Sequence, residues 1–221
     1  MPLADLLNAI PENEITASTG VTFYDRTYPV LLAAGEQMMA GIDTEQAASI
    51  LALGLAGWNR GPKGAQDYGR IVENRPNKFN KVINAINQII NLQVADRANH
   101  LLVDNALMSA CELLKGNDRR PITITEPSKF LHFLAPNWLP ILDSNVAEEL
   151  EHNADIGGGK ATWEVYITYT AELWRIGFFN NNIPNNNLRL RYQRIANQAV
   201  PQVSALRVID STLFNRARHR D

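Results

Sequence analysis

The sequence predicts an all-α protein, and three observations support this fold class. The chain of 221 residues is 45% hydrophobic, which is enough for a buried core. Nearly every long segment repeats its apolar residues with the spacing of a helix. The only β-like stretch, Ile-Thr-Ile-Thr at 122–125, is too short for a sheet and is expected to be an extended connector. We therefore expect one globular helical unit over residues 1–221, or two small lobes that meet near 115–126.

The first half of the chain contains three helices that the pattern predicts clearly. Residues 43–46, Asp-Thr-Glu-Gln, are typical of a helix start, and the apolar run that follows ends at Gly57-Trp58. Four glycines and prolines mark 59–70 as a loop that also carries basic residues. Amphipathic spacing then predicts helices over 77–94 and 96–114.

The second half begins with a helical segment over 126–150. Glu126-Pro127-Ser128 is expected to open a short helix that Pro136 ends, and Asp143 or Ser144 is expected to cap the next helix. Further helices are predicted at 161–177, after the hinge Gly157-Gly158-Gly159, and on either side of Pro201, after an Asn-rich loop at 180–187.

The charge is unevenly distributed along the chain. The net charge is −2, yet residues 156–221 carry nine basic and four acidic side chains, whereas 1–155 carry 12 basic and 19 acidic ones. The basic third would suit a polyanion such as nucleic acid, because phosphate binding depends on local Lys and Arg placement. Charge alone favours the alternative, a solvated arginine face.

Cysteine content and hydropathy indicate the compartment. The single cysteine, Cys111, excludes an internal disulfide and a Cys-rich zinc site, which favours a reducing environment. No apolar stretch approaches the roughly 20 residues of a membrane span, and the first residues lack the order of a signal peptide. We expect a cytoplasmic protein with no membrane association.

Several enzyme classes are excluded by residue type. The sequence has no G-x-x-x-x-G-K-[ST], G-x-S-x-G or H-E-x-x-H motif, which excludes the P-loop, α/β-hydrolase and zinc-protease chemistries. The four histidines do not form a recognisable ligand set: they are His100, His132, His152 and His219.

Lys129 and Asp143 are the strongest catalytic candidates. If 136–142 turns the chain back, the amine of Lys129 and the carboxylate of Asp143 approach a common cleft. This pair suits cleavage of an N-glycosidic bond, because a carboxylate stabilises positive charge on the sugar and a desolvated lysine can attack the sugar carbon. The simpler alternative is that Asp143 is only a helix cap and Lys129 only a surface lysine. The residues alone favour that alternative.

The segment 126–150 resembles the catalytic region of the helix-hairpin-helix DNA glycosylase superfamily. It is most similar to a bacterial group with the 8-oxoguanine DNA glycosylase fold, which has an aromatic-rich lysine helix followed by a Leu-Asp cap. Two further motifs agree with that group: Gly-Trp-Asn-Arg-Gly-Pro at 57–62 resembles its glycine-rich loop, and Val-Ile-Asp-Ser-Thr-Leu-Phe at 208–214 resembles its closing helix. The resemblance covers roughly residues 45–215.

This resemblance implies a two-lobed helical enzyme that flips a nucleotide out of DNA and excises its base. Lys129 would be the nucleophile or lyase residue, and Asp143 would activate the attacking group or stabilise the transition state. Possible pocket walls are Trp58, Trp138 and His132, although core packing is the alternative for each. Arg60 and Lys63 would contact phosphate or fill the gap left by the base.

The chain departs from the superfamily in two respects. The glycine turn that precedes the lysine is missing from Ile-Thr-Ile-Thr-Glu-Pro-Ser-Lys at 122–129, and only 14 residues separate Lys129 from Asp143. The phosphate contacts would then come from arginines of the last two helices, such as Arg189 and Arg191. One cysteine cannot hold an iron–sulfur cluster, and no cofactor is expected.

Three functions are therefore compatible with the sequence. The first is a DNA glycosylase, with DNA as partner and no obligate protein partner, in repair or in defence against phage with modified DNA. The second is a nucleic-acid-binding module without catalysis, whose binding would weaken steeply with salt. The third is a helical protein-interaction domain whose arginine-rich end meets an acidic partner.

Overall fold

The protein is described here by a computed structural model, which covers residues 1–42, 44–58, 76–92, 100–114, 123–178, 187–200 and 202–220. Regular structure within these ranges is helical throughout and includes no strand, so the predicted all-α class is confirmed. None of the described helices is long and apolar enough to cross a membrane. The helices are α1 (Leu3–Ala9), the 3-10 helix η1 (Glu12–Glu14), α2 (Thr22–Ala40), α3 (Thr44–Trp58), α5 (Pro76–Ile90), α6 (His100–Leu114), α7 (Thr125–Leu134), α8 (Ser144–Ala154), α9 (Trp163–Arg175), α10 (Asn187–Gln198) and α11 (Ala205–Arg218).

The observed helix boundaries match the predicted ones where a stop signal or a cap lies in adjacent residues. Helix α3 ends at Trp58 as predicted, and Asp143 caps α8 through its side chain. The predicted extended connector is wrong at its C-terminal end, because Ile124 already has helical dihedral angles (φ −61°, ψ −24°) and α7 begins at Thr125. The amide of Ser128 donates to the carbonyl of Ile124 at 3.0 Å, which starts the helix earlier.

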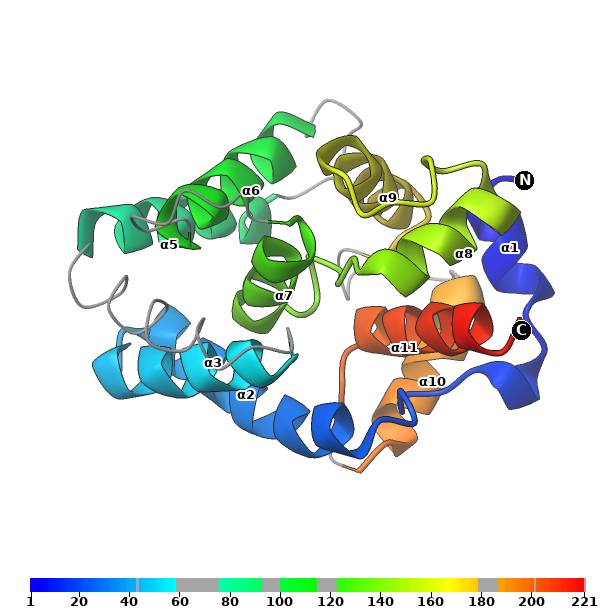
Figure 1. Ribbon diagram of the computed structural model, residues 1–221, viewed down its shortest axis with the longest axis horizontal. Coiled ribbons are helices and arrows are strands. Elements are labelled where there is room, and N and C mark those ends of the chain that lie inside the picture. Colours follow the sequence, from blue (N-terminus) through cyan, green and yellow to red (C-terminus); the bar gives the residue numbers. More distant parts are fainter. Residues whose placement is uncertain are drawn as a thin grey trace.

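The helices are arranged around α7. In Figure 1, α3, α5 and α6 lie on one side of α7, and α1, α8, α10 and α11 lie on the other. Helix α2 runs below α7 from the first group toward α11. Helices α2, α3 and α6 contact α7 directly, and α11 packs between α8 and α10. The buried apolar side chains form one continuous cluster that extends from Leu3 to Leu213. Helix α7 therefore lies where the two groups of helices meet.

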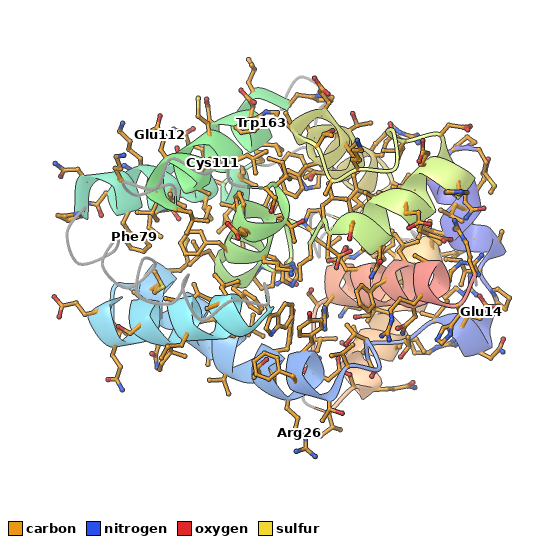
Figure 2. The ribbon with its side chains drawn as sticks, viewed as in Figure 1. Glu14, Arg26, Phe79, Cys111, Glu112 and Trp163 are labelled. Carbon is orange, nitrogen blue, oxygen red and sulfur yellow. The ribbon has the colours of Figure 1, made fainter. Side chains whose placement is uncertain are left out.

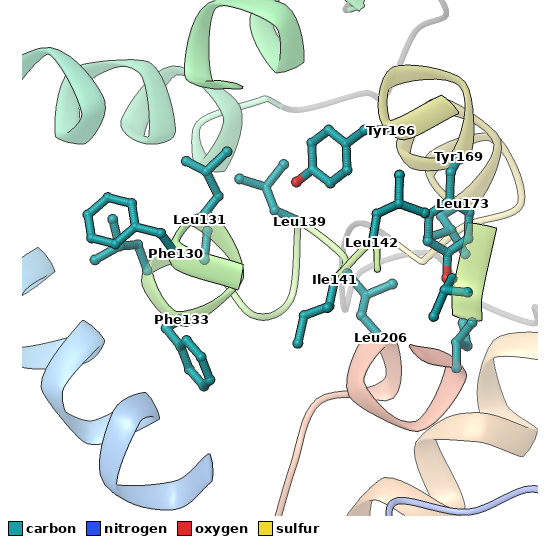
Figure 3. Packing of buried hydrophobic residues seen from close by; sticks show 14 of the residues in the cluster. Phe130, Leu131, Phe133, Leu139, Ile141, Leu142, Tyr166, Tyr169, Leu173 and Leu206 are labelled. Carbon is teal, nitrogen blue, oxygen red and sulfur yellow. The ribbon is translucent and has the colours of Figure 1, made fainter. Parts of the chain in front are cut away.

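Two contacts explain how closely the elements approach α7. Gly35 of α2 faces the backbone of α7 so tightly that a methyl group there would overlap the carbonyl oxygen of Phe133. On the other side, Leu139, Ile141 and Leu142 of the turn after α7 pack against α9 and α11 (Figure 3). Both the lysine helix and the turn that leads to Asp143 are thus held by tertiary packing.

A third contact connects α6 to α9. The indole nitrogen of Trp163, at the start of α9, donates to Oδ1 of Asp104 on α6 at 2.6 Å. Figure 2 shows Trp163 at this junction. The hydrogen bond to a carboxylate adds direction to the apolar packing of the two helices.

Candidate functional site

Lys129 is buried inside the molecule. Its side chain is 5% exposed, and its Nζ donates to the carbonyl oxygen of Trp58 at 3.3 Å. The same nitrogen lies 5.7 Å and 6.0 Å from the ring centres of Trp58 and Tyr24. Aromatic faces and the carbonyl end of a helix both attract a cation, so both stabilise positive charge at this position. The alternative of a surface lysine is wrong.

Asp143 is the N-cap of α8, and its carboxylate also lines the pocket that contains Lys129. Oδ1 accepts a hydrogen bond from the amide of Val146 at 3.0 Å, and the side chain is half-buried. The helix dipole stabilises negative charge at this position. The pocket has a volume of about 20 Å³, which is room for one water molecule. Its lining residues are Thr19, Tyr24, Trp58, Lys129, Ile141, Asp143, Val146, Arg207, Asp210 and Phe214.

A serine next to Lys129 fixes the turn that carries Asp143. Ser128 Oγ accepts from the amide of Leu142 at 3.1 Å, and it lies 3.1 Å from the carbonyl oxygens of Leu142 and Thr125, to either of which it can donate. Because Ser128 precedes Lys129 and Leu142 precedes Asp143, one hydroxyl links the neighbours of both candidate residues. A buried hydrogen bond thereby ties the helix that carries the amine to the turn that carries the carboxylate.

His132 supports the same turn and lies outside the pocket lining. Its ring is fully buried, and burial lowers the pKa of the imidazole to about 3, so the ring is neutral. Nδ1 donates to the carbonyl oxygen of Leu139 at 2.7 Å, and Nε2 accepts from the hydroxyl of Tyr28 at 2.9 Å. The ring therefore connects α2 to the turn.

Asp210 of α11 lines the pocket and, like Arg207, was not predicted from the sequence. Its side chain is 2% exposed; Oδ2 accepts from the amide of Ile141 at 2.8 Å, and Oδ1 accepts from the hydroxyl of Tyr169 at 3.0 Å. Burial raises the pKa of this carboxyl to about 8, although both hydrogen bonds and the charge of Arg207 oppose the shift. The available signal was an acidic residue in the middle of the mixed apolar and polar stretch at 205–213.

Arg207 brings a second cation to the aromatic wall. Its guanidinium carbon lies 4.7 Å from the ring centre of Tyr28 and 5.3 Å from that of Trp58, and Nη2 lies 3.5 Å from Oδ1 of Asp25. Trp58 is 3% exposed, and its indole nitrogen donates to the hydroxyl of Thr27 at 2.8 Å. Arg207 also lines a larger cleft of about 360 Å³ between α2 and α10.

Three other predicted site residues, Trp138, Arg189 and Arg191, are described by the structure and do not line the pocket. Trp138 is half-buried against the core, and its carbonyl oxygen accepts from the indole of Trp174 at 2.7 Å. Arg189 is buried, which lowers the pKa of its guanidinium. Arg191 donates to the backbone carbonyls of Leu7, Asn8 and Ile10 at the end of α1. Arg60 and Lys63 lie outside the described residues.

Several arginines of the basic C-terminal third pair with acceptors of the protein itself. Arg216 and Arg220 both contact Glu149, a fully buried carboxylate on α8. Arg216 also reaches Glu14, which lies beside the end of α11 in Figure 2. These charges stabilise the fold, so the positive excess of the sequence overstates the charge available to a polyanion. Further pairs join Arg175 to Glu172 and Arg194 to Glu12.

Neither the protein-family models, the curated proteins nor the solved structures compared with this chain matched it. Among the described residues, no three His, Cys, Asp or Glu side chains gather in a way that could hold a metal ion.

Proposed function

We propose that the protein is a DNA glycosylase with a two-lobed helix-hairpin-helix fold, which excises a damaged or modified base. The observation that carries this proposal is the pocket in which a buried amine, Lys129, and a carboxylate, Asp143, converge from different helices. Cleavage of an N-glycosidic bond develops positive charge on the sugar, which a fixed carboxylate stabilises. The resemblance of the segment 126–150 to the catalytic region of these enzymes supports the same assignment.

In the proposed reaction, the ammonium of Lys129 first gives a proton to the Asp143 carboxylate that lines the same pocket. The neutral amine then forms a bond to C1′ of the extruded nucleotide while the bond to the base breaks, and the base leaves with the electron pair. Opening of the sugar ring, in which a proton moves from the new C1′–N nitrogen to the ring oxygen, then gives a Schiff base, from which AP lyase cleavage can follow. In a reaction without lyase character, water attacks C1′ and gives its proton to Asp143.

The walls of the pocket suit a flat aromatic substrate. Trp58 and Tyr24 present rings beside Lys129, and Phe214 of α11 lines the pocket as well. A volume of about 20 Å³ is far below that of a nucleobase site, so base flipping requires the pocket to open. We assign the first phosphate contacts to Arg60 and Lys63, because Arg191 is engaged with α1.

The closed pocket favours a second candidate, a nucleic-acid-binding module without catalysis. In such a module, Lys129 would be a structural cation on the carbonyl of Trp58, and Asp143 would be a helix cap. This candidate predicts binding of DNA that weakens with salt and no base release.

The experiment is an excision assay with a panel of DNAs. Purified protein is incubated with oligonucleotides that carry oxidised, alkylated or deaminated bases, and with phage DNA that carries hypermodified cytosines. Strand breaks are scored with and without hot alkali, and borohydride is added to trap a Schiff base. We expect alkali-dependent breaks that Asp143→Asn abolishes, since asparagine keeps the helix cap and loses the charge. We expect Lys129→Gln to abolish the trapped adduct and the exposed control Lys160→Gln to keep it.

Two results would separate the candidates. Intact DNA throughout the panel, together with salt-sensitive binding, would refute the glycosylase and favour the binding module. Full excision by Asp143→Asn would refute the role of the carboxylate while leaving the activity itself established.

A further inference from the structure

The pocket contains two carboxyl groups in different environments. Asp143 is half-buried at the N-terminus of α8, where its side chain accepts from the amide of Val146. Asp210 comes from α11 and is 2% exposed, and both side chains line the same cavity as Lys129. In glycoside cleavage, two carboxyl groups held in such different environments divide the work, one as carboxylate and one as acid.

We propose that Asp210 is the general acid of the reaction, which protonates the departing base while Asp143 serves the sugar. This inference rests on the proposed glycosylase function. As the C1′–N bond breaks, the base takes the electron pair, and the proton of the Asp210 carboxyl moves to the base. Asp210 is left as a carboxylate, and it regains a proton from water after the base has left.

The surroundings of Asp210 keep its carboxyl group neutral and hold it in a fixed orientation. The amide of Ile141 and the hydroxyl of Tyr169 each occupy one lone pair of a different oxygen, so both oxygens are held in place and a site for the acidic proton remains. Because burial raises the pKa of the group to about 8, the protonated form exceeds the ionised form about tenfold at pH 7. The titratable and charged groups that face it are Arg207 on α11, Asp143 at the start of α8, Tyr166 and Tyr169 on α9, Lys129 on α7 and Tyr28 on α2.

The structure also explains why this role can be separated from a structural one. Asp210→Asn keeps an oxygen for the amide of Ile141 and an amide group opposite the hydroxyl of Tyr169, which can accept as well as donate. Asparagine has no proton to give to a base at neutral pH. The turn that carries Asp143 is thus retained while acid catalysis is removed.

The test compares two reactions of the same variant. We expect Asp210→Asn to slow base excision from the DNA that the wild type cleaves in the panel by about 10²- to 10⁴-fold. The variant should still form a borohydride-trapped adduct with an oligonucleotide that carries a preformed abasic site, because that DNA has no base to protonate. In the wild type, excision should fall as the pH rises past about 8, and this decline should vanish in Asp210→Asn. Asp155→Asn, on a side chain that is 84% exposed, is the matched control.

The outcomes distinguish this inference from the function on which it rests. Excision by Asp210→Asn within threefold of the wild type would overturn the acid role and leave the glycosylase intact. Equal losses of excision and abasic-site trapping would overturn it too, since they would make Asp210 a positioning residue for the turn. A wild type that releases no base from any DNA of the panel would overturn both. Carbon-13 NMR of the Asp210 carboxyl is a readout independent of activity, and titration below pH 5 would also overturn the proposal.

Discussion

The buried carboxyl of Asp210 gives the protein a specific pH dependence of stability. Its pKa is about 8 in the native state against an ordinary 3.8, so between these values the native state holds a proton that the unfolded state lacks. The free energy of unfolding therefore falls as the pH rises, by about 1.4 kcal/mol per unit well below the native pKa and more slowly near it. Over the interval from pH 6.5 to 9, the loss amounts to about 2 kcal/mol.

The interval is chosen because of His132. Burial lowers the pKa of this imidazole from 6.5 to about 3. The contribution of His132 to the free energy of unfolding therefore decreases as the pH falls below about 6.5. From pH 4 to 6 the two groups have opposite slopes and nearly cancel. Above pH 6.5 the unfolded-state imidazole becomes neutral as well, so the slope due to His132 fades and the slope due to Asp210 exceeds it.

Urea unfolding at pH 6.5, 7.5, 8 and 9 provides the measurement. We expect the wild type to lose about 2 kcal/mol over this interval relative to Asp210→Asn, because groups common to both chains cancel in the difference. Asp5→Asn, on an exposed side chain in the first turn of α1, should follow the wild type. Parallel curves for the wild type and Asp210→Asn would refute the claim that the native state carries a proton on this carboxyl.

Three further predictions concern the turn after α7, the contact of α2 with α7, and the end of α1. Ser128→Ala removes the acceptor of the buried Leu142 amide, and we expect a loss of about 1–3 kcal/mol in urea unfolding together with slower excision. Gly35→Ala should lower the thermal midpoint sharply, because its methyl group would overlap the backbone of α7, whereas Gly158→Ala meets nothing within 4 Å and should leave the midpoint unchanged. Arg191→Gln should cost about 1–3 kcal/mol of stability and leave DNA affinity at fixed salt unaltered, since its guanidinium holds the end of α1; a large loss of affinity would restore it to the DNA interface.

The convergence of Lys129 and Asp143 was predictable because its signals are local. Pro136 marks the end of α7, and an aspartate followed by an apolar run is a common helix cap, so the order of helix, turn and carboxylate can be read from adjacent residues. The burial of Lys129 was not predictable, because the aromatic wall that covers it comes from α2 and α3. Its depth depends on tertiary packing.

The missed residues lie on α11, where the helical pattern carries little information. Residues 205–213 are buried without a break, so no solvent face of the helix marks the orientation of Arg207 and Asp210. The paired arginines illustrate the same point for charge. Composition shows a basic C-terminal third, but the buried carboxylate of Glu149 and the carbonyls of α1 are contacts that only the fold can reveal.

The burial of Lys129 also makes it a reporter of its own exposure. A side chain that is 5% exposed reacts with an acylating reagent only while the surrounding rings have moved aside, whereas exposed lysines of the same chain, such as Lys160, react at once. The ratio of the two labelling rates, read by mass spectrometry, measures the fraction of time for which the amine is open to solvent. This measurement requires no knowledge of the substrate. Any DNA that changes the ratio of the two labelling rates is a DNA that the protein binds.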